Sequence, residues 1–350
     1  MRIAKRIGAV LAAAVLVTGA AACGSDNKGG GGGSSSKKPA DVKVGVVLKT
    51  FENEYWTAMR DGVNAKAGEL GTQVKVDAAA TEADTQEQVS KLEAMIGANY
   101  DCLAVAPITA TNLIQPLVQV AQKKTPIVNL DSPISEKDAS SAGVNLSTFI
   151  ASNHEQAGVL GAQEMAKQLG PKTSGAQIVL IGGIAGDTTS NARIKGFKDT
   201  AAKNGMKIAQ EGNADWDREK ALTLASDILR SKPNVAGFFA ANDTMALGIA
   251  QAISNAGKTG KIEVIGVDGA KDAETAIKKG TMSATVAQFP YAVGQLGVES
   301  CVAAAQGKTV PKRVESPLQV VTPDNVDKAL AAYPKPFEPV KDPIAALITK

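Results

Sequence analysis

The sequence predicts an α/β fold in which two doubly wound parallel-sheet lobes are joined by three hinge crossings. Short apolar runs alternate with segments of helical periodicity from residue 42 onward, which is typical of parallel sheets covered by helices. The alternation begins again after residue 153, so the same rhythm occupies two halves of the chain. With 350 residues and 44% hydrophobic content, the chain can bury two large cores.

In the first half, the run at 42–48 is almost wholly apolar, as expected of a strand buried on both faces. The helix that follows carries Trp56, Met59 and Val63 on one face. The elements expected in this half are strands at 42–48, 74–78, 102–106 and 127–130, helices at 54–70 and 112–123, and a further helix around Leu92.

The second half contains the clearest unit, a strand, a helix and a strand within residues 235–268. This order indicates a right-handed crossover between parallel strands. Its strands end next to Asn242 and Asp268, at the edge where open parallel sheets bind their ligands. The other elements expected here are helices at 153–169, 190–204, 218–230 and 271–279, and strands at 177–181, 206–209 and 283–287.

The last regular helix, at 291–306, is expected to return to the first half. The chain would then cross between the lobes near Ile150, Gln288 and Ser316. The expected domains are an N-terminal lobe of residues 42–149 and 289–315, a C-terminal lobe of residues 150–288 and 316–333, and a Pro-rich tail at 334–350. Because prolines interrupt regular structure, we expect this tail to lie on the surface and to be loose at its end.

Residues 1–23 have the pattern of an export signal. A basic start precedes an apolar stretch, and three alanines precede Cys23. Cys23 resembles the lipid-modified cysteine of bacterial lipoproteins, although Ala20 stands where leucine is usual; ordinary cleavage at an Ala-x-Ala site is the alternative. The Gly/Ser-rich segment at 24–41 favours the lipoprotein, because it suits a flexible tether. We expect an extracytoplasmic protein anchored to the outer face of the cell membrane by lipid on Cys23, or otherwise a soluble periplasmic one.

The charge of the chain gives no support for nucleic-acid binding. Removal of the signal takes away three basic residues and no acidic one, so the 38 basic residues fall to 35 and equal the 35 acidic ones. A neutral protein lacks the basic surface that phosphate backbones require. Beyond the signal, no segment is apolar enough to span a membrane.

Neither a metal site nor a catalytic set is evident. A single histidine and two distant cysteines, Cys102 and Cys301, do not make a zinc site. In an exported protein these cysteines form either a disulfide or two buried free thiols, and both readings stay open. The glycines at 182–186 do not match a dinucleotide loop, and His154 has no nucleophile beside it. We therefore expect no enzyme activity and no cofactor.

Polar and aromatic residues gather at the predicted strand ends, which favours a sugar site. Sugar hydroxyls donate to carboxylates and accept from cationic and amide groups, while sugar C–H faces lie against aromatic rings. Each residue has a simpler explanation, such as helix capping for Asn242 or core packing for Trp56. Together the candidates are Lys49, Asn53, Tyr55, Trp56, Asp131, Arg193, Trp216, Asn242, Asp268 and Gln288.

Several motifs closely resemble the pentose- and hexose-binding proteins of ABC importers, the periplasmic sugar-binding family of the ribose and allose type. The resemblance covers about residues 42–322. The motifs are VGVVLKT at 44–50, NEYW at 53–56, ADWDREKAL at 214–222, ANDTMA at 241–246, NAGKTGK at 255–261 and TVAQ at 285–288.

The resemblance implies two lobes that close on a sugar. It implies hydrogen bonds to the hydroxyls from Asn53, Asp131, Arg193, Asn242, Asp268 and Gln288, and ring contacts from Tyr55, Trp56 and Trp216. Lys49, Ser132 and Trp216 differ from the ribose-type pattern, which has serine, arginine and phenylalanine there, and this favours a hexose. Two departures from the family are Tyr55, which replaces phenylalanine, and the pair Asn153 and His154, which replaces Asp-Asn.

These features together predict an extracytoplasmic solute-binding lipoprotein. It is expected to act as a monomer, to capture a monosaccharide by lobe closure and to deliver it to the membrane permease of an ABC importer. The alternative is a sugar sensor that presents its ligand to a chemoreceptor or sensor kinase.

Overall fold

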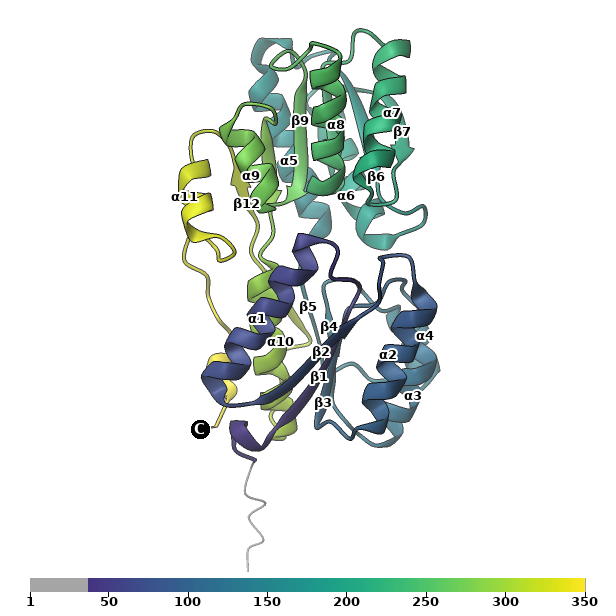
Figure 1. Cartoon of the computed structure of the whole chain (residues 1–350), viewed down its shortest axis with the longest axis vertical. Helices are drawn as coiled ribbons and strands as arrows, with labels where there is room; N and C mark the ends of the chain where they lie inside the picture. The colour runs from purple at the N-terminus through teal and green to yellow at the C-terminus, as the bar shows by residue number, and fades with distance from the viewer. Residues whose placement is uncertain (1–36, 350) are drawn as a thin grey trace, which may run out of the picture. The chain divides into compact units, whose positions relative to one another are not determined.

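The computed structural model describes residues 37–349, which form one compact unit (Figure 1). The expected signal peptide, Cys23 and the tether up to residue 36 lie outside the described residues. Among the residues that are described, none of the helices is both long and apolar enough to cross a membrane.

The first sheet has six parallel strands in the order β11-β5-β4-β3-β1-β2. Its strands are β1 (Lys43–Leu48), β2 (Gln73–Ala78), β3 (Cys102–Val105), β4 (Ile127–Leu130), β5 (Thr148–Ser152) and β11 (Arg313–Ser316). Its helices are α1 (Glu54–Leu70), α2 (Thr85–Gly97), α3 (Ile114–Gln122), α4 (Glu136–Ser141) and α10 (Pro290–Ala305), and a 3-10 turn at Pro39–Asp41 precedes β1. Val46 and Leu48 pack under α1 and α10, whereas Val47 packs under α2 and α3 on the other face, as the pleat of a strand requires.

The second sheet repeats this plan in the order β12-β10-β9-β8-β6-β7. Its strands are β6 (Gln177–Gly182), β7 (Lys207–Asn213), β8 (Gly237–Ala240), β9 (Glu263–Asp268), β10 (Ala284–Ala287) and β12 (Gln319–Val321). Its helices are α5 (His154–Leu169), α6 (Thr188–Lys203), α7 (Arg218–Ser231), α8 (Asp243–Asn255), α9 (Lys271–Lys278) and α11 (Val326–Ala332), with a 3-10 turn at Gly170–Lys172. Phe197 of α6 stacks on Phe239 of β8 with ring centroids 4.4 Å apart, and Met245 and Ile249 of α8 pack on the opposite face of the sheet.

The predicted α/β fold of two doubly wound parallel sheets is confirmed. The sequence did not predict β5, β11 or β12, and β12 pairs antiparallel with β10 at the edge of the second sheet. The chain passes between the sheets after Ser152, after Ala287 and after Ser316. These passages support the lobe boundaries drawn from the sequence, which stay a proposal.

The segment after α11 packs more closely than the expected loose tail. Ile344 is fully buried in the core of the first sheet, and the backbone of Thr349 exchanges two hydrogen bonds with the side chain of Gln306. Phe337 meets Phe289 edge to face at 6.3 Å. A 3-10 turn, Ala345–Leu347, completes this return (Figure 1). The chain therefore passes a fourth time from the second sheet to the first.

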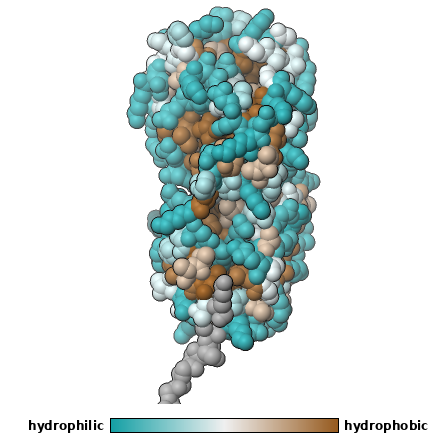
Figure 2. Space-filling model, turned by 90° about the vertical axis from the view of Figure 1, so that its left-hand side faces the viewer, coloured by the Kyte–Doolittle hydropathy of each residue, from teal (hydrophilic) through white to brown (hydrophobic). Residues whose placement is uncertain are grey.

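Figure 2 shows the side of the molecule along which this segment runs, with separate hydrophobic patches among hydrophilic residues. Val340, at 39% exposure, is the large hydrophobic side chain that the described residues expose. Helical structure in this segment is limited to the 3-10 turn at Ala345–Leu347, but the apolar side chain of Ile344 still reaches the core.

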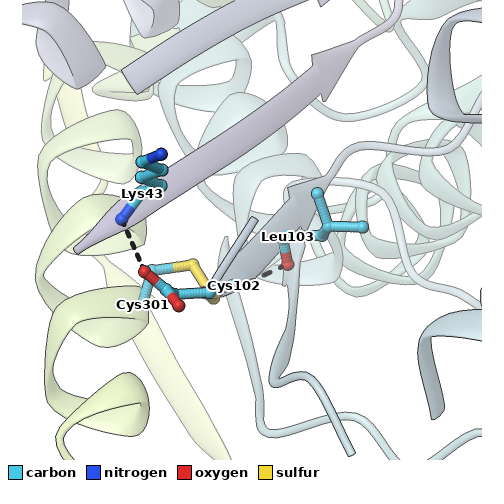
Figure 3. Close-up of a disulfide and its surroundings, with 5 residues drawn as sticks. Lys43, Cys102, Leu103 and Cys301 are labelled. Atoms are coloured by element: carbon cyan, nitrogen blue, oxygen red, sulfur yellow. Dashed lines mark hydrogen bonds between the residues drawn. A yellow bond between two sulfur atoms is a disulfide. The ribbon is translucent and has the colours of Figure 1, made fainter. Parts of the chain in front are cut away.

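A disulfide between Cys102 and Cys301 joins the start of β3 to α10 (Figure 3). Both residues are fully buried, and their Cα atoms are 5.4 Å apart. Of the two readings left open by the sequence, the structure has the bridged one. The bridge links residues 199 positions apart and so fixes the returning helix α10 on its sheet.

We predict that the double variant Cys102→Ala/Cys301→Ala is less stable by about 4 to 5 kcal/mol, because a cross-link over so long a loop removes much unfolded-state entropy. Denaturant unfolding measures the difference. A reductant is expected to lower the midpoint of the wild-type protein and to leave the double variant unchanged. Equal midpoints for the two proteins without reductant would contradict a bridged pair.

Candidate functional site

The ends of strands from both sheets surround one buried polar cavity. Its volume is about 30 Å³, room for about one water molecule. It is lined by Lys49, Asn53, Tyr55, Trp56, Glu82, Asp131, Thr189, Arg193, Trp216, Asn242 and Asp268. Nine of the ten residues predicted from the sequence therefore lie around it, and the tenth, Gln288, reaches it through a hydrogen bond to Asp268.

On the side of the first sheet, Asp131 is the centre of the hydrogen bonding. Tyr55 Oη donates to Asp131 Oδ1, and Ser132 Oγ donates to Oδ2 at 3.1 Å. Lys49 follows β1, is only 4% exposed and holds its Nζ 5.4 Å from the ring centre of Trp56. An acceptor, a cation and an aromatic face thus lie together at one wall.

On the side of the second sheet, Arg193 and Asp268 form a buried ion pair. Arg193 Nη1 donates to Asp268 Oδ1 at 3.4 Å and to the carbonyl oxygen of Ala241 at 2.7 Å. Gln288 Nε2 donates to the same Asp268 oxygen at 2.8 Å. The guanidinium carbon of Arg193 lies 5.9 Å from the ring centre of Trp216. This wall, like the first, therefore combines a carboxylate, a cation and an aromatic ring.

Unusual backbone conformations aim three of these side chains. Asp131, Trp216 and Asp268 have φ of 57°, 66° and 136°, a region that residues other than glycine rarely adopt. Strain of this kind is stored preferentially at functional sites. Gly183 leaves room for the indole, because a Cβ there would lie 2.1 Å from the Trp216 ring. Gly183, from the glycine-containing segment at 182–186, thus belongs to this wall.

Two asparagines act as helix caps as well as cavity residues. Asn242 Oδ1 accepts from Met245 N at the start of α8, and Asn53 Oδ1 accepts from Tyr55 N at the start of α1. The simpler explanation of Asn242 as a cap is therefore correct, and its side chain also lines the cavity. The capping hydrogen bond fixes the orientation of each side-chain amide. The Nδ2 group of each asparagine takes no part in the cap and can donate to another group.

His154, which has no catalytic partner evident in the sequence, links the two walls. Its Nε2 lies 3.0 Å from the carbonyl oxygen of Asp131, and its Nδ1 lies 3.4 Å from Arg193 Nη2. Burial, together with the charge of Arg193, lowers the pKa of His154 to about 4. At neutral pH the ring is therefore uncharged, donating through Nε2 and accepting at Nδ1.

The two aspartates of the cavity are shifted in opposite directions. Burial raises the pKa of Asp131, but His154, Lys49 and the Tyr55 hydroxyl outweigh it, and the pKa lies below the ordinary value. Burial dominates at Asp268 and raises its pKa well above the ordinary value despite Arg193. Asp131 is thus the acceptor that stays ionised over the wider range of pH.

Sequence reasoning missed Glu82 and Thr189 as cavity residues. Asp131 was predicted because it is a polar residue directly after a strand. Glu82 lies in the loop after β2, so the same criterion predicts it when that loop is included. Thr189 lies in the first turn of α6, where Asp187 is the helix cap. Its hydroxyl is buried without a hydrogen-bond partner among the described residues.

The cavity continues into a groove of about 760 Å³. Asn53, Glu82 and Trp216 line both spaces and so mark where they join. Within residues 37–349, no group of three or more His, Cys, Asp or Glu side chains is arranged to hold a metal ion.

Residues 44–309 match the sequence model of a family described as a periplasmic binding protein domain. The chain belongs to this family. It is 37% identical to the D-allose-binding periplasmic protein of Escherichia coli K12. The alignment spans 274 residues and covers 78% of this chain and 88% of that protein. The chain is 30% identical over 279 residues to the ribose import binding protein of Bacillus subtilis 168, covering 80% and 87%.

Solved structures agree with this membership. An ABC transporter periplasmic solute binding protein from Actinobacillus succinogenes 130z with bound D-allose has a TM-score of 0.78 and 28% identity, covering 82% of this chain and 99% of that one. A solute binding protein from Bacillus halodurans C-125 with bound myo-inositol has a TM-score of 0.75 and 27% identity, covering 86% and 100%. The family resemblance seen in the sequence is confirmed. As a periplasmic binding protein, the chain is a solute binder and not an enzyme.

A further buried carboxylate, Glu274, lies outside the cavity lining and makes stability depend on pH. Glu274 on α9 is 3% exposed, and its Oε2 has no hydrogen-bond partner among the described residues. Burial, with Asp243 and Glu54 nearby, raises its pKa to about 8. The folded protein therefore holds a proton here that the unfolded chain releases above the ordinary value of 4.5.

We predict that this group makes the protein less stable as pH rises from about 5 to 8, and that Glu274→Gln flattens this part of the stability curve. Urea unfolding at intervals across the range measures both slopes. Glu299, whose pKa burial raises to about 7, adds a slope of the same sign in both proteins. The exposed Glu219→Gln is the matched control, and equal slopes in wild type and Glu274→Gln would contradict the prediction.

Proposed function

We propose that this periplasmic binding protein is the monosaccharide-binding component of an ABC importer, and that its ligand is a hexose held in the cavity between the two sheets. One observation carries the proposal. Arg193 Nε and Thr189 Oγ1 belong to residues that line this cavity, and Gln288 Oε1 belongs to the residue that donates to Asp268; all three atoms are buried without hydrogen-bond partners among residues 37–349. Buried polar atoms normally have partners, because an unpaired one costs about 1 to 3 kcal/mol.

A sugar hydroxyl suits these atoms because it both donates and accepts. Arg193 Nε needs an acceptor, Gln288 Oε1 needs a donor, and Thr189 Oγ1 takes either. Lys49 and the carboxylates offer further charge-assisted bonds, and Trp56 and Trp216 offer aromatic surface for the C–H faces of a ring. The proposed contacts are those ten residues predicted from the sequence together with Thr189.

Binding would require the lobes to separate and close again. A cavity with room for about one water molecule is too small for a monosaccharide, so the ligand enters only when Trp216 and its neighbours move away from the wall formed by Trp56 and Asp131. The passages near Ser152, Ala287 and Ser316 are the hinges of this motion. The ligand then stabilises the closed form because it contacts both walls at once, and this form docks on the permease.

The preference for a hexose rests on residues that differ from the ribose-type pattern. Lys49 and Trp216 both line the cavity, and Ser132 donates to the Asp131 carboxylate from the adjoining position. The relatives above are named for allose and for ribose, and 37% identity to the allose binder exceeds 30% to the ribose binder. Family membership also supports an extracytoplasmic location, and we propose that lipid on Cys23 provides the anchor.

We predict that the purified protein gains thermal stability with one of six sugars: D-allose, D-ribose, D-xylose, D-galactose, D-glucose and myo-inositol. A ligand of the folded state raises the unfolding midpoint with the logarithm of its excess over Kd. D-Allose is expected to give the largest shift. No shift with any of the six would leave the fold intact and rule out this assignment.

The matched variants are Asp268→Ala, inside the cavity, and Asp272→Ala, on the groove. Asp268→Ala is expected to weaken binding by at least about 30-fold, because it leaves the Arg193 charge unpaired and removes an acceptor. Asp272→Ala is expected to change Kd by less than about 3-fold. Equal losses in the two variants would contradict the cavity as the binding site.

We predict that Cys23→Ser moves the protein from the membrane fraction to the soluble fraction of cells that process lipoproteins. Replacing the thiol removes the attachment point of the lipid and leaves the folded residues unchanged. Immunoblots of the two fractions measure the distribution, and Ser25→Ala, two residues after Cys23, is the control. A soluble wild-type protein would favour cleavage at the Ala-x-Ala site instead.

A further inference from the structure

Glu82 stands on a loop that the structure holds in place from both ends. The loop follows β2 and leads into α2, whose cap is Asp84. At its start, Thr50 Oγ1 donates to the carbonyl oxygen of Ala80, and Ala80 N donates to Glu87 Oε2. These bonds fix the loop to the end of β1 and to the first turn of α2. The Glu82 side chain is therefore positioned by the framework of the first sheet.

The two carboxylate oxygens of Glu82 have different surroundings. Oε1 accepts from Asn53 Nδ2 at 3.0 Å and from Trp56 Nε1 at 2.7 Å. Within residues 37–349, Oε2 makes no hydrogen bond, and it is not among the buried atoms that lack a partner. One oxygen thus orients two cavity side chains, while the other has a free acceptor position.

The free oxygen belongs to a residue at the junction of the cavity and the groove. Glu82 lines both spaces, as do Asn53 and Trp216. A ligand in the cavity would present the hydroxyl nearest the groove to this part of the wall. A carboxylate accepts hydrogen bonds and cannot donate them, so this position requires a donor from the ligand.

We propose that Glu82 is a specificity-determining residue whose Oε2 accepts a hydrogen bond from one hydroxyl of the bound monosaccharide while Oε1 holds Asn53 and Trp56 in place. This inference rests on the proposed function. A site built around a hydrogen bond rejects an analogue that lacks the donor, because the bound analogue then covers the acceptor and leaves it unpaired. Glu82 would therefore discriminate at one carbon of the ring, the one whose hydroxyl faces the groove.

The test is calorimetric titration of the purified protein with D-allose and its monodeoxy derivatives at C2, C3, C4 and C6. Wild type is compared with Glu82→Gln, which keeps the shape and loses the charge. Glu52→Gln is the matched control, because Glu52 lines the groove without lining the cavity. If another of the six sugars gives the largest thermal shift, that sugar and its monodeoxy derivatives replace D-allose.

Glu82→Gln is expected to weaken binding of the parent sugar by about 10- to 100-fold, the range for a hydrogen bond to a charged group. Glu52→Gln is expected to stay within about 2-fold. One deoxy derivative should bind wild type and Glu82→Gln equally, because the partner hydroxyl is already gone, whereas the others keep the full loss.

Two results would overturn the inference without touching the proposed function. They are an unchanged Kd for the parent sugar in Glu82→Gln, and an equal loss for every derivative, which would leave Glu82 with an orienting role alone. If Glu82→Gln does not fold, Glu82→Asp is expected to show the same loss confined to one hydroxyl, and a uniform loss would count against the inference. If wild type binds none of the sugars, the proposed function fails first, and this inference fails with it.

Discussion

The need to give every buried polar group a partner constrains the centre of this protein. Arg193 and Asp268 are buried together, and a buried charge is stable only when it is paired and hydrogen-bonded. The pair is held by Ala241 and Gln288, and His154 connects it to the wall that carries Asp131. Burial and mutual repulsion also explain the pKa values: Asp268, close to Asp243, is raised, while Asp131, surrounded by donors and cations, is lowered.

The two sheets matter to function because they deliver these groups to one place. Parallel strands end on the same edge, so polar residues after β1, β4, β8 and β9 meet without any sequence proximity. Close helix packing refines the positions. A Cβ on Gly158 of α5 would lie 1.9 Å from the carbonyl oxygen of Arg193, so this glycine lets α6 approach and sets the depth of the guanidinium. The disulfide similarly fixes α10 on the first sheet.

Much of this could be predicted from the sequence because the relevant patterns are local. The apolar runs predicted most of the strands, and nine of the ten residues proposed for the site line the cavity. Tyr55, Trp56 and Arg193 lie in helices α1 and α6 and not at strand ends. Glu82 was not predicted because it lies four residues beyond the end of β2, in the loop and not directly after the strand. The role of His154 could not be predicted, since it depends on the distance between two lobes. The path of the C-terminal segment could not be predicted either. Ile344 is a single apolar residue among prolines, and its burial depends on a tertiary contact.

The same polar groups pair with one another in the structure and would pair with the ligand in the proposed complex. This limits the affinity that the site can reach. In the structure the cavity residues largely pair with one another, as Tyr55 does with Asp131 and Arg193 with Asp268. A ligand gains only the difference between its own hydrogen bonds and those that it replaces, together with the atoms that it newly satisfies. In the proposed complex, the unpartnered atoms of Arg193, Gln288 and Thr189 would therefore give the largest binding free energy for each contact. In the proposed complex, recognition would depend on completing a hydrogen-bond network that the protein alone leaves incomplete.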